Sequence, residues 1–270
     1  MDINFDLLLK VAIEASLEAG DSIMKIYESD DFDVSVKGDD SPLTRADLSS
    51  HKIIEQHLEK TEIRMLSEEG KTISYEERKD WDLLWIVDPI DGTKEFIKKN
   101  GEFTVNIALI QDQRPILGVV YAPAINTLYF SSKDIGAFKN DSMASSLSFE
   151  EIKESSVLLP INRNDDTYVV VASKSHMSPE TQEYIDELEK TYGKVETISK
   201  GSSLKLCMVA DGTADCYPRF APTMEWDTAA GNAICIGANK EVIDWESKKE
   251  MVYNRKELLN NWFLVKQKKV

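Results

Sequence analysis

The stretch WIVDPIDGTKEF, residues 85–96, constrains the fold most, because it must change from strand to helix within a few residues. The run Leu83 to Val87 is apolar and β-branched, which is typical of a buried strand. Pro89 fixes its own φ and disfavours helical backbone at Asp88, so we predict that the strand ends there. Asp91 then serves as the N-cap of the helix that follows. Two carboxylates are therefore placed together where a strand becomes a helix.

The backbone that follows this corner is suited to holding an anion. The N–H groups of Gly92 and Thr93 are expected to point outward, at the positive end of the helix dipole. Gly92 has no side chain, so an anion can approach the backbone closely. The corner thus predicts a phosphate site beside two carboxylates.

Further acids occur in three other short motifs: SPLTRAD with Asp47, Ser67-Glu68-Glu69-Gly70, and Glu225-Trp226-Asp227. Carboxylates aimed at one point repel each other and are costly to desolvate unless cations lie between them. Oxygen ligands without His or Cys favour Mg²⁺ or Mn²⁺ over Zn²⁺. Two such ions about 4 Å apart are the usual arrangement for phosphoester hydrolysis. The acids therefore predict a two-metal site.

Each motif also has a simpler interpretation. Thr44 to Asp47 resembles a capping box that only starts a helix. Glu68 to Gly70 can be a solvated turn, and Asp91 or Asp227 can be a helix cap without further function. An acidic binding protein without catalysis is also an open hypothesis, and it predicts that Asp91→Asn leaves biological activity intact.

A phosphatase that forms an aspartyl-phosphate is a further alternative, because DPIDGT resembles the DxDGT of the haloacid dehalogenase type. That chemistry needs an acid two residues after the nucleophilic Asp. Here Asp88 and Asp91 are three residues apart with Pro89 between them, which disfavours it.

The net charge of -16 disfavours nucleic acid and anionic lipid as partners, and it repels a phosphorylated substrate unless bound ions reverse the field locally. No apolar run approaches the roughly 18–20 residues that span a bilayer. The start, MDINFDLLLK, lacks the basic segment of a signal peptide. Cys207, Cys216 and Cys235 have no CxxC spacing, which favours a reducing compartment without disulfides or zinc. We therefore expect a cytoplasmic protein, and leave peripheral contact with the inner membrane and a homodimer open.

Hydrophobic spacing predicts helices from Phe5 to Ile26 and from Thr44 to Leu58. A third helix, within SPETQEYIDELEKTYG, is expected to be capped by Ser178 and to end at Gly193. The predicted strands are Met65-Leu66, Leu83–Val87, Phe103–Ile110, Ile116–Tyr121, Leu128–Phe130, the TYVVVAS run and Ala214–Tyr217. Two more helices are expected, one after Gly201 and one over EWDTAAGNAICIGAN. Strands interleaved with helices predict a layered α/β or α+β architecture.

We predict two halves, residues 1–150 with the DPIDGT site and residues 151–270 with Asp227 and the substrate loops. Their boundary is expected in the polar, weakly patterned stretch 134–164.

The motifs SEEG, WIVDPIDGT and EWDTAAG, in this order, resemble the inositol monophosphatase superfamily, and the similarity spans about Phe5 to Gly237. The resemblance implies the sugar-phosphatase fold, a layered αβαβα sandwich. KGDDSPLTRAD, DGTKEF, GEFTVNIALI, GSSLK, YPR and PTMEWDTAAG further resemble its branch of bacterial 3'(2'),5'-bisphosphate nucleotidases.

For the metals, the resemblance implies that Glu68, Asp88 and the carbonyl of Ile90 hold a first Mg²⁺. Asp88, Asp91 and Asp227 are implied to hold a second, with Asp88 bridging. More than two ions, or Mn²⁺, are compatible with the same ligands.

For catalysis, the resemblance implies that Gly92 and Thr93 bind the scissile phosphate. Thr93 and Asp47 are implied to orient the attacking water, and Glu68 to help deprotonate it. Glu69 is expected to lie beside the metals without binding one.

For the substrate, we expect the 3'-phosphate of adenosine 3',5'-bisphosphate to be removed, giving AMP, with 3'-phosphoadenylyl sulfate as a further substrate and Li⁺ as an inhibitor. The metal ligands Glu68, Ile90, Asp91 and Asp227 are expected to face the substrate as well. Gly201, Ser202, Lys205 and Arg219 are candidates for its second phosphate or nucleoside. An ordinary capped helix with a surface Lys, and a solvated Arg, are the alternatives. His176 is expected at the surface without a catalytic role.

An inositol-1-monophosphatase or a fructose-1,6-bisphosphatase of the same superfamily is the alternative function.

Overall fold

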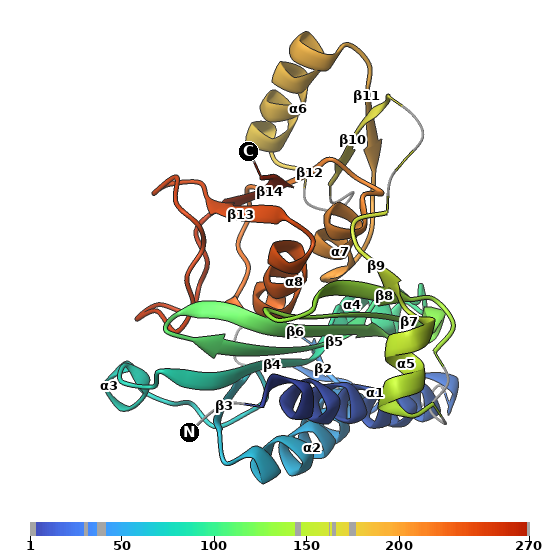
Figure 1. Cartoon of the computed structure of the whole chain (residues 1–270), viewed down its shortest axis with the longest axis vertical. Coiled ribbons are helices and arrows are strands. Elements are labelled where there is room, and N and C mark those ends of the chain that lie inside the picture. Colours follow the sequence, from blue (N-terminus) through green and yellow to red (C-terminus); the bar gives the residue numbers. More distant parts are fainter. Residues whose placement is uncertain are drawn as a thin grey trace.

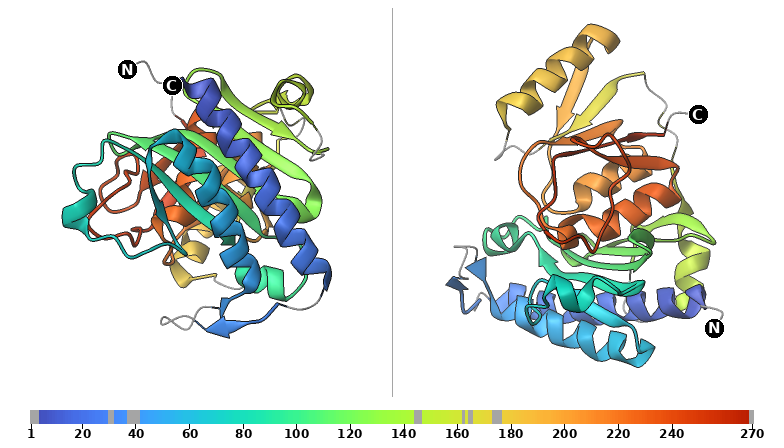
Figure 2. Two further views of the ribbon diagram at one scale, coloured as in Figure 1. Left: turned by 90° about the horizontal axis from the view of Figure 1, so that it is seen from below. Right: turned by 90° about the vertical axis from the view of Figure 1, so that its left-hand side faces the viewer.

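Five layers of helices and sheets stack along the long axis of the molecule (Figure 1). The computed structural model describes residues 4–29, 32–36, 42–143, 147–161, 163, 166–172 and 177–268. The first layer is α1 (Phe5–Ser29) with α2 (Arg45–Leu58), which lie side by side (Figure 2). A seven-stranded sheet follows, then α7 (Leu204–Asp211) and α8 (Glu225–Gly237), then a five-stranded sheet, and α6 (Pro179–Tyr192) lies outermost. The expected αβαβα sandwich is confirmed.

The seven-stranded sheet is antiparallel except for its first pair of strands, which is parallel. Helices cover both faces, so its central strands are buried almost throughout, and their sequences are continuously apolar rather than alternating. In spatial order the strands are β3 (Arg64–Ser67), β4 (Leu83–Asp91), β5 (Thr104–Gln111), β6 (Arg114–Ala122), β7 (Thr127–Ser132), β8 (Gly136–Asn140) and β9 (Val157–Leu158).

The five-stranded sheet has a parallel part and an antiparallel part. Its spatial order is β11 (Val195–Ile198), β10 (Tyr168–Val171), β12 (Cys216–Arg219), β14 (Phe263–Gln267) and β13 (Lys240–Asp244). The first three strands run parallel, and the last three pair antiparallel. Shorter elements complete the described fold: β1 (Ser35–Val36), β2 (Pro42–Leu43), α3 (Tyr75–Arg78), α4 (Thr93–Ile97), α5 (Phe149–Ser155) and the 3-10 helices Glu59–Thr61 and Pro123–Ile125.

Local capping chemistry explains why the predicted helices start where they do. The hydroxyl of Thr44 accepts the N–H of Ala46, and the carboxylate of Asp47 accepts the N–H of Thr44, so the capping box is present. Ser178 caps α6, and Gly193 follows its last residue. These short-range predictions are confirmed.

The stretch 134–164 was expected to be a weakly patterned boundary, yet it forms β8, α5 and β9. A capping box between Ser148 and Glu151 starts α5, a sequence feature that the prediction overlooked. Because β9 pairs with β8, the chain leaves the first sheet only after Leu158. The strands β11, β13 and β14 and the helix α3 were also not predicted.

The helix α8 packs closely against the seven-stranded sheet, and this brings segments that are far apart in the sequence together at the site. A Cβ at Gly118 on β6 would lie 2.4 Å from the carbonyl oxygen of Ala230 on α8. Only glycine leaves room for this approach. The first turn of α8, with Asp227, is thereby carried toward the last residues of β4.

No helix in the described ranges is long and apolar enough to cross a membrane. His176 and residues 37–41 of KGDDSPLTRAD lie outside the described residues.

Candidate active site

The corner of WIVDPIDGT is a bulge in a continuing strand. β4 runs on to Asp91, where we expected it to end before Pro89. Asp88 pairs with Asn106 and Asp91 with Thr104, so three steps along β4 match two along β5. The missing N–H of proline is tolerated at such a bulge, and a bulge re-aims the side chains around it.

The N-cap of α4 also differs from the prediction. Gly92, with φ of +96°, takes this position, and the helix begins at Thr93. A positive φ is accessible to glycine at little cost, whereas an aspartate at the cap would strain the same backbone. Gly92 is therefore required by the turn as well as by the close approach of an anion.

Asp88 carries the clearest sign of an absent partner. The side chain is buried; its Oδ1 accepts the N–H of Ile90 at 3.0 Å, while its Oδ2 is buried without a hydrogen-bond partner. Burial, together with the charges of Glu68, Asp91 and Asp227, raises the pKa of Asp88 well above its ordinary value. Four carboxylates thus act on one another, and one buried oxygen is left for a cation or a proton.

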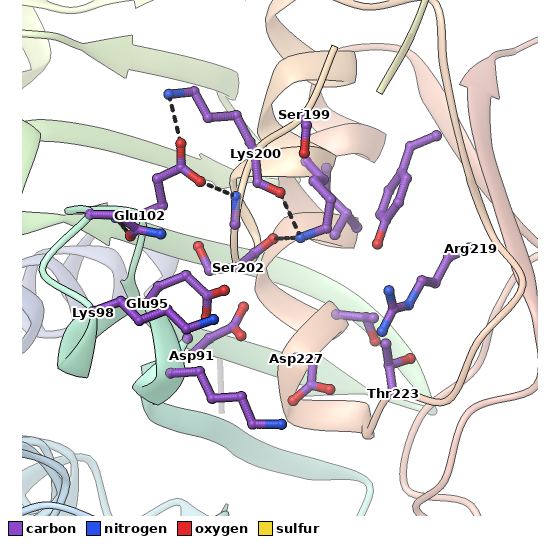
Figure 3. A pocket seen from close by; sticks show the side chains of 18 of the residues that line it. Asp91, Glu95, Lys98, Glu102, Ser199, Lys200, Ser202, Arg219, Thr223 and Asp227 are labelled. Carbon is purple, nitrogen blue, oxygen red and sulfur yellow. Dashed lines mark hydrogen bonds and ion pairs between the residues drawn. The ribbon is translucent and has the colours of Figure 1, made fainter. Parts of the chain in front are cut away.

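Asp91 ends β4 and Asp227 lies in the first turn of α8, and both side chains line the same cavity (Figure 3). Partial burial raises the pKa of Asp91, and the charge of Lys205 opposes this shift. Partial burial and the charge of Asp91 raise the pKa of Asp227 to about 8. One oxygen of Asp227 accepts the N–H of Met224 at 2.7 Å, which orients it at the start of α8.

Asp47 uses its two side-chain oxygens for different contacts. Its Oδ2 belongs to the capping box of α2, while its Oδ1 accepts the hydroxyl of Thr93 at 3.1 Å. The simple capping interpretation and the contact with Thr93 are therefore compatible.

Glu68 and Ile90 lie close to this group. Glu68 directly follows β3 and donates its N–H to Val87 at 3.1 Å, and it lines the same cleft as Asp91, Thr93 and Asp227. The carbonyl of Ile90 has only a long contact, 3.4 Å, with the hydroxyl of Thr93.

Across the described ranges, no three or more His, Cys, Asp and Glu side chains form a ready-made metal site.

Beside the carboxylates lies a cavity of about 360 Å³. It is lined by the predicted residues Asp91, Gly92, Gly201, Ser202, Lys205, Arg219 and Asp227, together with Lys94, Lys98 and Lys200. The cationic side chains on its wall stand beside the acids Glu95 and Glu102, so the lining is far less acidic than the chain as a whole.

Two of the predicted substrate residues have buried donors without a protein partner. These are the hydroxyl of Ser202 and the Nε of Arg219, whose Nη2 donates to the carbonyl of Pro222 at 3.0 Å. Lys205 is instead engaged with backbone: its Nζ donates to the carbonyls of Ser202 at 2.7 Å and Lys200 at 3.3 Å. Burial lowers the pKa of Lys205 to about 8. Lys205 thus shapes the turn, and Ser202 and Arg219 offer unpaired donors.

Two acids of the site were not predicted to matter. Glu102 accepts the N–H of Gly201 at 2.8 Å and pairs with Lys200 at 3.3 Å, so it joins the loop after α4 to the turn before α7. Glu225 is fully buried and accepts from the backbone of Asn254 and from Arg255. Their partners are about 100 and 30 residues away in sequence, so no local pattern could reveal them. The buried Ser203 and Asn106 were also missed, although both lie in motifs that the sequence singled out.

We predict that Gly201→Ala raises KM by about 10- to 100-fold, because displacement of a substrate-positioning turn by a fraction of an ångström is costly. A Cβ at this position would lie 2.7 Å from the carbonyl oxygen of Glu102 and 3.0 Å from Cγ of Glu95. Steady-state kinetics measure the effect. Gly193→Ala is the control for KM: nothing lies within 4 Å of the added atom, and although its φ of +77° should lower stability, Gly193 does not line the cavity, so KM should stay unchanged. An unchanged KM in Gly201→Ala would show that the turn does not contact substrate.

Comparison with known proteins agrees with this geometry. A profile described as the inositol monophosphatase family matches residues 4–269. The 3'(2'),5'-bisphosphate nucleotidase CysQ of Escherichia coli K12 is 43% identical over 262 residues, covering 96% of this chain and 99% of that protein. CysQ of Salmonella typhimurium is 42% identical over the same shares. The crystal structure of CysQ from Bacteroides thetaiotaomicron, a bacterial member of the inositol monophosphatase family, superposes with a TM-score of 0.91 at 47% identity, covering all of both chains. With the ordered motifs, the shared fold and these full-length matches, the chain belongs to the inositol monophosphatase family.

Proposed function

We propose that this chain is a metal-dependent phosphatase that removes the 3'-phosphate from adenosine 3',5'-bisphosphate, giving AMP and phosphate. A sulfated form of this nucleotide, 3'-phosphoadenylyl sulfate, is proposed as a second substrate. The full-length similarity to 3'(2'),5'-bisphosphate nucleotidases supports the substrate class. The observation that carries the proposal is the partnerless buried oxygen of Asp88 among three further carboxylates, next to a cavity with cationic walls.

The donor set fits hard divalent cations. Glu68, Asp88 and the carbonyl of Ile90 would hold one Mg²⁺ or Mn²⁺, and Asp88, Asp91 and Asp227 a second. Bound in this way, the ions supply Lewis-acid activation of water and neutralise charge on the phosphate. A cation also satisfies Asp88 Oδ2 and removes the repulsion that keeps the four carboxylates apart.

The protein's own groups orient the reaction. The hydroxyl of Thr93 donates to Asp47, so its lone pairs remain available to accept a hydrogen bond from the attacking water and orient it. Glu68 lines the same cleft as Thr93, from where it would accept a proton from that water. The N–H groups of Gly92 and Thr93 donate to the scissile phosphate.

The second phosphate or sulfate of the substrate would lie in the cationic cavity. The hydroxyl of Ser202 and the Nε of Arg219 are the donors without a partner there, and a buried donor is costly to leave unpaired. Lys205 holds the Gly201 turn and adds positive charge nearby. An inositol monophosphate has no second phosphate to satisfy these donors.

We further propose that residues 1–150 supply the metal and phosphate groups, while residues 151–270 supply Asp227 and the substrate-recognition loops. The cysteines are buried and free, which supports a reducing, cytoplasmic location.

Phosphate release from a panel of substrates tests the function. With Mg²⁺, release is expected from adenosine 3',5'-bisphosphate at a kcat/KM at least about 100-fold above that for inositol 1-phosphate, which would leave the two unpaired donors of the cavity unsatisfied. Fructose 1,6-bisphosphate has a second phosphate but no nucleoside, and it is also expected to be the poorer substrate. EDTA should abolish release, and Li⁺ is expected to inhibit it. If inositol 1-phosphate or fructose 1,6-bisphosphate is cleaved more efficiently, the proposed nucleotide substrate is wrong and the preferred compound takes its place.

A further inference from the structure

Segments far apart in the sequence meet at a single buried hydroxyl, that of Ser203. This residue is the N-cap of α7 and is 1% exposed. Its Oγ lies 2.9 Å from Oδ2 of Asp91 and 2.6 Å from the carbonyl oxygen of Asp227. The side-chain Nδ2 of Asn106 donates to the same Oγ at 2.9 Å. One serine therefore connects the end of β4, the middle of β5 and the first turn of α8.

The hydrogen bonds around Ser203 have a defined direction. The hydroxyl of Thr104 donates to Oδ1 of Asn106 at 2.9 Å, which turns the Nδ2 of that amide toward Ser203. Because Ser203 accepts this bond, its only proton is left for Asp91 or for the carbonyl of Asp227. Thr104 and Asn106 are buried on the same face of β5, so leaving any of these polar groups unpaired would be costly.

These hydrogen bonds lead to the carboxylate of Asp91, a proposed metal ligand whose orientation must be held. Asp91 ends β4 of the seven-stranded sheet and Asp227 lies in the first turn of α8, so the two carboxylates stand on elements of different layers. Hydrogen bonds to a metal-ligating carboxylate restrict its rotation, and their removal typically lowers metal affinity by about 10- to 100-fold. Because the one proton of Ser203 is shared between the Asp91 carboxylate and the carbonyl of Asp227, it ties that carboxylate to the helix start on which the other ligand stands.

We propose that Ser203, oriented by Asn106 and Thr104, is a positioning residue that sets the Asp91 carboxylate and the start of α8 in the relation needed to bind divalent ions. The inference rests on the proposed metal-dependent function and adds a residue to which neither the motifs nor the resemblance gave a role.

Metal binding measured without substrate provides the test. Isothermal titration with Mg²⁺ and with Mn²⁺ should show about 10- to 100-fold weaker binding in Ser203→Ala than in the wild type. Its phosphate release should recover in part as Mg²⁺ is raised. Ser131→Ala is the matched control, because Ser131 is equally buried, at 1% exposed, and its hydroxyl has no hydrogen-bond partner in the described part of the chain. That variant should bind both ions like the wild type.

A second variant covers the case in which Ser203→Ala fails to fold. Thr104→Val keeps the shape of the side chain and removes only the bond that orients Asn106, so a smaller loss of affinity, about threefold, is expected from a bond worth roughly 0.5–1 kcal/mol. Affinities in both variants equal to that of Ser131→Ala would overturn the inference. If the wild type cleaves none of the phosphate panel but Ser203→Ala still weakens ion binding, the inference stands and the proposed function fails.

Discussion

Asp88→Asn should lower phosphate release by at least about 10³-fold and, at the same time, make the metal-free protein more stable. Loss of a proposed metal ligand should remove several kcal/mol of transition-state stabilisation, and each 1.36 kcal/mol is a factor of ten in rate. Stability should rise by about 1–2 kcal/mol, because a buried acceptor without a partner, surrounded by like charges, is removed. Phosphate release at saturating Mg²⁺ and urea denaturation in EDTA at pH 8 measure the two effects.

Asp82→Asn, an exposed acid just before the other end of β4, makes the same chemical change and is the control. It should alter neither activity nor stability beyond about 0.5 kcal/mol, as is usual for surface substitutions. Full activity in Asp88→Asn would exclude Asp88 as a metal ligand. A metal-free protein that is less stable after the change would show that the carboxylate has a favourable partner.

Glu225→Ala is the change with the largest expected effect on stability, about 3–5 kcal/mol, because it leaves buried partners without their acceptor. The carboxylate accepts the N–H of Asn254 at 2.6 Å, the N–H of Arg255 at 3.1 Å and the Nε of Arg255 at 3.1 Å. These bonds hold the connection between β13 and β14 against the start of α8. Differential scanning calorimetry should show a Tm lower by roughly 6–20 °C, and Mg²⁺ should bind more weakly because Asp227 lies two residues further along the helix.

Glu250→Ala is the control, because it breaks an ion pair at the surface instead of in the interior. Glu250 and Arg114 are 2.8 Å apart, but both side chains are about half exposed, at 48% and 50%. Such exposed pairs contribute about 0–1 kcal/mol. Equal destabilisation in the two glutamate variants would mean that Glu225 does not restrain the start of α8.

The sequence predicted correctly those features that depend on interactions between residues close together in the chain. The apolar run before Asp88, the capping box at Thr44 and the Pro and Gly that bound α6 each act within a few residues, and the structure contains them. The bulge at Pro89 was missed because whether a strand continues past a proline depends on the strand beside it. The partner strand β5 accepts the extra residue, and β4 therefore extends to Asp91.

Long-range contacts within the site could not be predicted in the same way. In the sequence, nothing distinguishes Glu102 from other acids in polar loops. In the structure, its carboxylate accepts the N–H of Gly201. Lys205 was expected to offer its charge to a phosphate, yet its Nζ donates to two backbone carbonyls of its own turn. Polarity in a sequence shows that a group needs a partner, but not which one the fold supplies.

The sequence by itself determined the chemistry, because the kind of side chain and its nearest neighbours define what can bind: oxygen ligands for a hard cation, and backbone N–H groups after a Gly for a phosphate. Only the tertiary structure decided that Asp88 and Asp91 meet Asp227, more than 130 residues later. Hydrophobic burial of α8 between two sheets, at a distance that only Gly118 permits, brings these repelling charges together. The hydrophobic effect is not directional, so the apolar pattern of a sequence predicts which face of a helix is buried. The position of that helix against a sheet depends on how the two complete surfaces fit together.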